Sequence, residues 1–106
     1  MQFRGGMSEL LRQASRMQRK MEDAKAKFKE NTFEVTGAND KIKVVVNGAR
    51  EVVSVTIDPE FLKSEDLGLV QDALVGVVNA ALTKSNEQLE AHMKTVTGGV
   101  NIPGVV

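Results

Sequence analysis

The sequence contains no cysteine, no tryptophan and no tyrosine, and it has one histidine among 106 residues. The lack of cysteine excludes disulfides, thiolate metal sites and thiol nucleophiles. With four phenylalanines as the only aromatic residues, stacking on single-stranded bases is poorly supported. No stretch approaches the roughly 18 apolar residues of a membrane span, and the first residues lack the apolar region of a secretory signal. We therefore expect a cytoplasmic protein without a membrane partner.

Charge is balanced overall but is distributed unevenly along the chain. The 14 basic and 14 acidic residues cancel. Residues 1–30 nevertheless hold eight Lys or Arg against four acids, whereas residues 31–106 hold six against ten. A chain of this length forms one domain with a modest core. We predict a single domain over 1–106 that gains burial from a partner subunit.

An amphipathic helix is predicted over 7–30, because apolar residues recur there every three or four positions without an intervening glycine or proline. Gly5 and Gly6 are expected to loosen the chain before it. Lysines flank the apolar positions on both sides, which disfavours a self-pairing coiled coil. The apolar seam should therefore close within the subunit or the dimer. This seam consists of Met7, Leu10, Ala14, Met17, Met21, Ala24 and Phe28.

An antiparallel meander of three short strands is predicted next, because β-branched residues alternate with polar ones between turn residues. A four-residue loop from Asn47 to Arg50 is favoured over a two-residue turn, since the shorter turn would put Glu51 on the core face. The longer loop pairs Val44 with Val53. The strands are expected at 32–37, 41–46 and 51–57.

The same register predicts which side chains share a face of the sheet. It pairs Ile42 with Val55 on the core face and sets Val45 beside Val52 on the opposite face, where solvent favours polar residues. Two isolated exposed valines and a subunit contact explain that pair equally well, since single apolar residues are common on surfaces. Our hypothesis is that Val45 and Val52 belong to a dimer interface.

The second half of the chain predicts a short helical turn and then a long helix. Asp58 before Pro59 is typical of a capped single turn, and Ser64 is expected to cap a long helix that ends near Val96. The first half of that helix should cover the sheet, and the second half could run beside the opening helix. The glycines and proline of 97–106 predict a flexible tail. The fold class is α+β.

Few residues are available for catalysis or metal binding. His92 lies late in the predicted helix without a partner, which favours a packing or surface role. Acids that cluster near the two helix starts could suggest a divalent metal, but helix N-termini attract acids for capping reasons alone. We therefore predict no metal site, no cofactor and no enzymatic activity. These acids are Asp58, Glu60, Glu65 and Asp66.

The opening helix also has a basic face. Arg12, Arg16 and Arg19 fall at i, i+4 and i+7, so they share its outer side, from which cations can reach phosphates. A solvated face stabilised by pairs such as Glu9 with Arg12 is the simpler explanation, favoured roughly three to one from these residues alone. If the face binds nucleic acid, duplex contact is the better form of the hypothesis.

Four stretches carry a further pattern, each weak alone but specific in combination. They are GMSELLRQASRMQRKM at 6–21, VNG at 46–48 followed by VSVTIDP at 53–59, VNAAL at 78–82 and TGGVNIPG at 97–104. Together they resemble the YbaB/EbfC family of bacterial nucleoid-associated proteins. The resemblance implies a homodimer of helix, three-stranded sheet, helix subunits, whose long helices project as arms that bind double-stranded DNA.

The resemblance also implies a location in the nucleoid, with effects on nucleoid organisation or gene expression, and no enzyme. The alternative is a protein-interaction adaptor whose helical arms grip another protein, which the neutral total charge and the methionine-rich seam favour. Carried onto this chain, the family's DNA contacts would be Arg12, Arg16, Arg19 and Lys20 on the first helix and Lys84 and Lys94 on the last.

Overall fold

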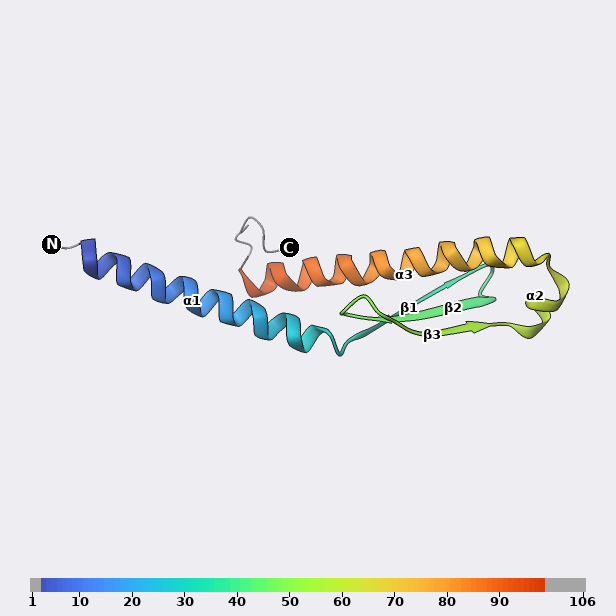
Figure 1. Ribbon diagram of the computed structural model, residues 1–106, viewed down its shortest axis with the longest axis horizontal. Helices are drawn as coiled ribbons and strands as arrows, with labels where there is room; N and C mark the ends of the chain where they lie inside the picture. Colours follow the sequence, from blue (N-terminus) through green and yellow to red (C-terminus); the bar gives the residue numbers. More distant parts are fainter. Residues whose placement is uncertain (1–2, 99–106) are drawn as a thin grey trace.

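The computed structural model describes residues 3–98, in which a helix, three strands, a short helix and a long helix follow one another (Figure 1). The strands form one antiparallel sheet in the order β1-β2-β3. The α+β class and the meander are thus confirmed. The elements are α1 (Phe3–Phe28), β1 (Thr32–Gly37), β2 (Ile42–Asn47), β3 (Val52–Ile57), α2 (Pro59–Ser64) and α3 (Leu67–Val96).

The molecule is a long rod. Its extents are 77 × 20 × 17 Å and its radius of gyration is 20.5 Å, against about 13 Å for a compact chain of this length. α1 and α3 overlap only near their C-terminal ends, so the N-terminal half of α1 projects beyond the end of α3 (Figure 1). Within residues 3–98, no helix has the length and apolar character needed to cross a membrane.

The core lies between α3 and the first two strands. α3 packs mainly across β1 and β2. This confirms the expectation that α3 covers the sheet. β3 is left at the open edge of the sheet, and its valines are exposed. The buried cluster consists of Ile42, Val44 and Val46 from β2 and Val77 and Ala81 from α3.

The register between β2 and β3 differs from the one predicted from the sequence, and that prediction was wrong. Val44 pairs with Val55 rather than with Val53, and Ile42 pairs with Ile57 rather than with Val55. The shift amounts to two residues, so the alternation of faces is preserved. The core face of β2 is therefore the one that the alternation predicted.

Two local features produce this shift. The Asn47 side-chain oxygen accepts the backbone N–H groups of Ala49 and Glu51 at 2.9 and 3.0 Å. This keeps residues 48–51 in the loop, which confirms a loop longer than two residues. A β-bulge then adds Val53 to β3 without a partner on β2.

Val45 and Val52 do not lie opposite each other, which corrects the expected pair. Val52 pairs with the buried Val46 on the side of the sheet that faces α3, whereas Val45 lies between Glu34 and Ser54 on the opposite face. The register makes that opposite face otherwise polar. Among the paired residues, Val45 is therefore the only apolar side chain on that face.

The start of α1 also differs from the expectation. Gly5 and Gly6 lie inside the helix, which begins at Phe3, rather than loosening the chain before it. A glycine costs about 1 kcal/mol relative to alanine in a helix interior. The good helix formers that follow offset this cost over a helix of 26 residues.

The two helices of the second half begin at aspartate caps. The Asp58 carboxylate accepts the Glu60 N–H at 2.8 Å and caps α2, as predicted. α3 is capped by Asp66, which accepts the Gly68 N–H at 3.1 Å. The predicted Ser64 cap was wrong, because Ser64 is the last residue of α2.

The long helix ends at Val96, as predicted. Thr97 is buried at its C-cap, and Gly98 takes the left-handed conformation, with φ of 65°, that commonly stops a helix. The remainder of the predicted 97–106 tail lies outside the described residues.

Candidate nucleic-acid interface

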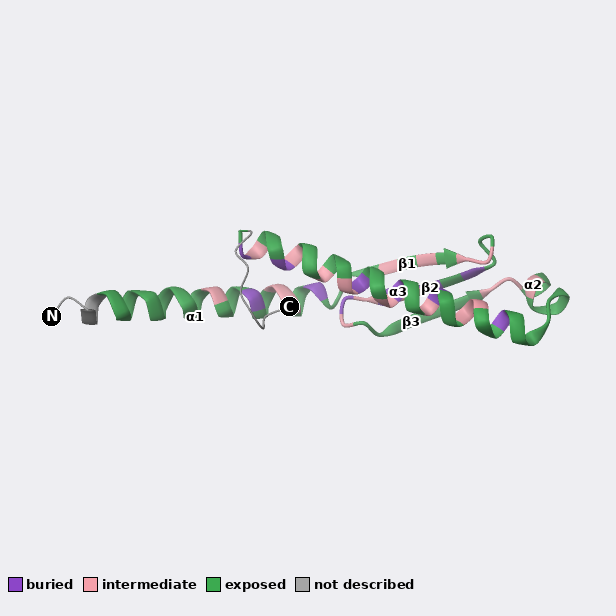
Figure 2. Ribbon diagram, turned by 90° about the horizontal axis from the view of Figure 1, so that it is seen from above, coloured by how far each residue is buried: buried purple, intermediate pink, exposed green. Residues whose placement is uncertain are grey.

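α1 exposes its apolar seam progressively toward the N-terminus. Phe28 and Met21 are 4% and 7% exposed, whereas Leu10 and Met7 are each 62% exposed. Figure 2 shows the same change along α1, from buried segments near the sheet to an exposed N-terminal half. The expected closure of the seam is confirmed only for its C-terminal half.

The arginine face consists of Arg12, Arg16 and Arg19, which are exposed and lie on the side of α1 away from the seam. Arg12 approaches Glu9 at 3.7 Å, with side chains 67% and 52% exposed. Such an exposed pair contributes little and leaves the cation accessible. Arg16 and Arg19 form no ion pair within 4.0 Å among the described residues. This face can therefore make contacts outward.

The remaining predicted contacts lie at separate places. Lys20 is exposed on α1, one turn beyond Arg16. Lys84 donates from Nζ to the backbone oxygen of Glu34 at 3.1 Å, which ties it to β1 rather than to the arm. Lys94 is exposed in the last turn of α3, where α3 runs beside α1. The described chain thus brings Lys94, but not Lys84, to the region where the two long helices overlap.

A cleft of about 420 Å³ lies at this overlap. The rings of Phe28 and His92 stack beside it, with centroids 5.4 Å apart and planes at 23°. His92 is half-buried by this contact, which confirms its predicted packing role. The lining comprises Lys20, Asp23, Ala24, Lys27, Phe28, Asn31, His92 and Val96.

Neither Lys27 nor this cleft is among the sites predicted from the sequence. Arg16, Lys20 and Lys27 recur at i, i+4 and i+11 and thus follow one side of α1. That periodicity was a usable signal for Lys27. The proximity of His92 and Val96 was not, because it depends on how α3 crosses α1.

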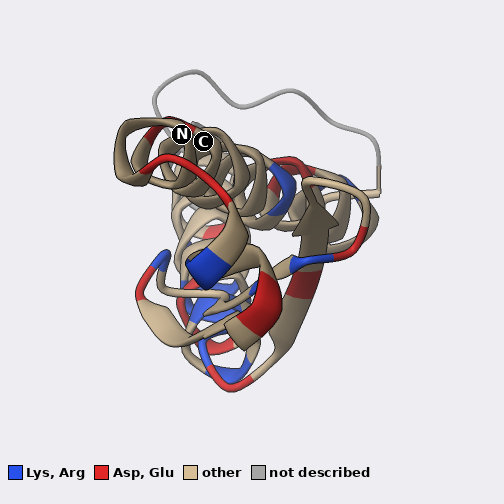
Figure 3. Ribbon diagram, turned by 90° about the vertical axis from the view of Figure 1, so that its right-hand side faces the viewer, with Lys and Arg blue, Asp and Glu red and all other residues tan. Residues whose placement is uncertain are grey.

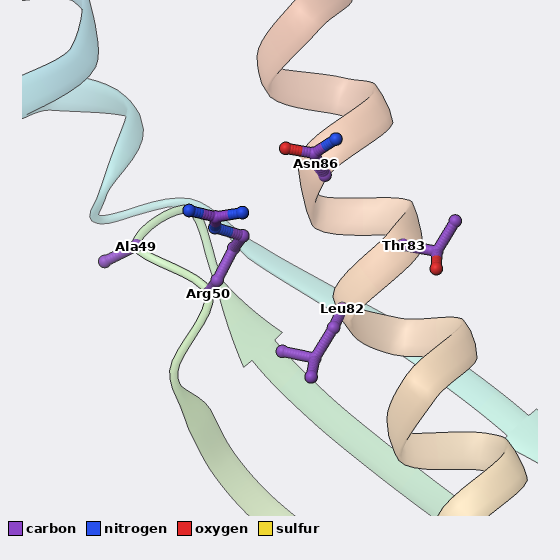
Figure 4. Close-up of a pocket in the computed structure, with 5 residues that line it drawn as sticks. All are labelled: Ala49, Arg50, Leu82, Thr83 and Asn86. Carbon is purple, nitrogen blue, oxygen red and sulfur yellow. The ribbon is translucent and has the colours of Figure 1, made fainter. Parts of the chain in front are cut away.

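A second hollow, of about 590 Å³, lies between the β2–β3 loop and α3 (Figure 4). Arg50, held at a positive φ of 61°, lines the hollow from the loop, and the other side is lined from α3 (Figure 4). Asn86 lines the same hollow and donates to the Glu90 carboxylate at 3.3 Å. Arg50 is the only cation among the lining residues that the structure describes, which makes this hollow a weaker phosphate site than α1. Its lining is Ala49, Arg50, Leu82, Thr83 and Asn86.

At the α2 end of the molecule, acidic and basic segments alternate (Figure 3). Lys41 approaches Asp58 at 3.6 Å, and Lys43 approaches Glu34 at 3.9 Å. Cations at this end are thus partly neutralised. No group of three or more candidate ligands within residues 3–98 could hold a metal ion. The basic character of the described chain is concentrated on α1.

Comparisons with known proteins agree with one another. A model of the YbaB/EbfC DNA-binding family matches residues 3–100. A nucleoid-associated protein of Clostridium kluyveri is 38% identical over 101 residues, which cover 95% of this chain and 89% of the relative. One from Pelotomaculum thermopropionicum is 37% identical over 101 residues, with 95% and 96% covered. The crystal structure of an uncharacterized Helicobacter pylori protein shares the fold, with a TM-score of 0.55 at 20% identity over 84% of this chain and 92% of that one.

Proposed function

Since the chain belongs to the YbaB/EbfC DNA-binding family, we propose that it is a nucleoid-associated protein that binds double-stranded DNA as a homodimer. The observation that carries this proposal is the exposed arginine face of α1. The protein acts as a binding protein rather than an enzyme. Its place is the nucleoid, hence the cytoplasm, and its effect is on nucleoid organisation or gene expression.

The proposed contacts are with DNA phosphates. From Arg12 to Lys20 the helix rises by about 12 Å, and a duplex carries one negative charge per roughly 1.7 Å of its axis. Each arm therefore meets several phosphates. Contacts of this kind fix position without reading bases, so sequence preference is modest. Lys94 adds a contact at the end of α3, and Lys84 contributes less because Glu34 already engages it.

The homodimer is proposed to form at β3. This strand is an open edge, and its Val52, Val53 and Val55 are 47%, 56% and 43% exposed. Natural sheets rarely leave such an edge uncovered, and a second subunit would remove these side chains from water. Val52 stays in the proposed interface. Val45, on the opposite face, joins it if the partner wraps around the edge.

A gel shift with two matched variants tests the DNA contacts. Replacing Arg12, Arg16 and Arg19 by Gln should weaken binding to a random-sequence duplex by on the order of a hundredfold or more at low salt, because a dimer loses about six phosphate contacts. The control removes the same number of charges from the sheet end and should shift the duplex almost as the unmodified protein does. Equal affinity of the two variants would overturn the proposed face. The control replaces Lys41, Lys43 and Lys63 by Gln.

The uncovered end of the seam supports a second candidate, the protein-interaction adaptor. Met7 and Leu10 of the seam are each 62% exposed, and Leu11, which lies outside the seam, is 66% exposed. A helix with such apolar anchors can lie in a hydrophobic groove of another protein. The adaptor is favoured if the protein gives no duplex shift at low salt and if a pull-down recovers a protein that the Leu10→Ala, Leu11→Ala variant does not recover.

A further inference from the structure

The cleft between α1 and α3 has a cationic wall. Lys20 and Lys27 line it from α1, and neither forms an ion pair within 4.0 Å among the described residues. Asp23 is the only carboxylate among the lining residues that the structure describes. The charge of this wall is therefore positive, and both ammonium groups can accept a new anionic partner.

The floor of the same cleft is largely carbon. Phe28 is 4% exposed and stacks on His92, which is itself half-buried. Val96, also half-buried, completes the α3 side. The ring stack joins the two helices, so the floor has a fixed shape. An apolar floor beside two ammonium groups matches a sugar-phosphate unit, whose deoxyribose presents carbon and whose phosphate oxygens accept hydrogen bonds.

The position of the cleft connects it to the arginine face. Arg16, Lys20 and Lys27 follow one side of α1, and Arg12 lies about 22 Å from Lys27 along the helix axis. That distance is roughly two-thirds of a duplex turn of about 34 Å. A DNA backbone that follows the arginine face therefore reaches the cleft.

We infer that the cleft holds one sugar-phosphate unit of the bound duplex, with its phosphate between Lys20 and Lys27 and its deoxyribose against Phe28, His92 and Val96. This inference rests on the DNA binding by α1 proposed above. Asp23 lies in the same lining and opposes the phosphate by charge repulsion. Removal of that one carboxylate is therefore expected to tighten DNA binding.

Two matched pairs of variants test the cleft by fluorescence anisotropy with a labelled random-sequence duplex. Lys27→Gln should weaken binding and should reduce the steepness of the salt dependence of affinity by about one for each subunit. Lys29 is exposed and lies outside the lining, so Lys29→Gln should change the affinity much less. Asp23→Asn should tighten binding severalfold, while Glu22→Gln, the neighbouring exposed acid outside the lining, should not. A gain of affinity does not arise from misfolding, so the second pair can still be interpreted if a lysine variant is unstable.

The outcomes separate this inference from the proposal on which it rests. If the unmodified protein does not bind the duplex at low salt, the proposed function itself fails. If it binds and the two members of each pair change the affinity equally, the cleft is not a contact, and the arginine face remains as proposed. Weakening by Lys27→Gln together with tightening by Asp23→Asn supports the cleft.

Discussion

Asp58 links the sheet to α2 through its carboxylate. The Glu60 N–H donates to it at 2.8 Å and lowers its pKa below the usual 3.8. Partial burial opposes this shift, and the Phe61 N–H and the Lys41 ammonium, 3.6 Å away, reinforce it. Because the pKa is lower in the folded state, the ionised carboxylate stabilises the fold above pH 3.8, and the contribution is lost as the pH falls through the folded pKa.

Replacement of Asp58 by Asn should therefore lower stability at neutral pH, and the difference from the unmodified protein should shrink in acid below pH 3.8. Urea unfolding followed by circular dichroism at both pH values measures this. Asp72→Asn, an exposed acid on α3, is the control and should leave stability nearly unchanged. A deficit of the Asp58 variant that is equal at both pH values would contradict the electrostatic explanation.

Position 48 requires glycine, because the β2–β3 hairpin approaches the end of α1 closely there. Gly48 is buried, and its N–H donates to the Asn31 oxygen at 2.9 Å. A Cβ at this position would overlap the backbone carbonyl of Phe28, which cannot rotate away as a flexible side chain could.

Gly48→Ala should accordingly destabilise the protein by about 1–3 kcal/mol, the usual cost of overpacking. Gly76→Ala is the matched control, because a Cβ there has no neighbour within 4 Å and alanine favours the helix by about 1 kcal/mol. Thermal or urea unfolding of both variants measures the difference. A neutral Gly48→Ala would show that the hairpin and α1 do not approach so closely.

Among the elements, α1 combines a buried half with an exposed half on one continuous seam. Met21→Ala should cost about 2–5 kcal/mol, because the side chain is 7% exposed and its removal leaves a cavity. Leu10→Ala, at 62% exposure, should change stability by no more than about 0.5 kcal/mol. Urea unfolding midpoints test this contrast. An equal loss at Leu10 would mean that a partner covers the N-terminal half of α1 in solution.

The order of elements and the core face of β2 could be predicted from the sequence, because alternation and helical periodicity are local signals. The β2–β3 register could not, because it depends on the side-chain bonds of Asn47 and on the bulge at Val53. The arginine face of α1 follows from spacing alone. The hydrogen bond from Lys84 to the backbone oxygen of Glu34 does not follow from spacing, because it depends on how α3 crosses the sheet.

At the scale of the whole molecule, the uncovered β3 edge requires a partner in the proposed account. Val52 and Val55 share the face of β3 toward α3. Replacement of both by Lys should prevent dimer formation, because two charges per subunit would be buried. Ser54→Lys with Thr56→Lys, on the opposite face of the same strand, is the control and should remain dimeric. Light scattering gives the molar mass of each variant. A dimeric valine variant would exclude this edge as the interface.

Salt dependence of duplex affinity tests the central claim, contact between the arginine face of α1 and DNA phosphates, most directly. The six arginines on the two arginine faces of a dimer should by themselves contribute a slope of about −5 to the logarithm of the binding constant against the logarithm of salt concentration, or roughly a thousandfold between 50 and 200 mM. Replacement of Arg12, Arg16 and Arg19 by Gln should flatten most of that slope. A slope near zero, or one that the three replacements leave unchanged, would contradict the account.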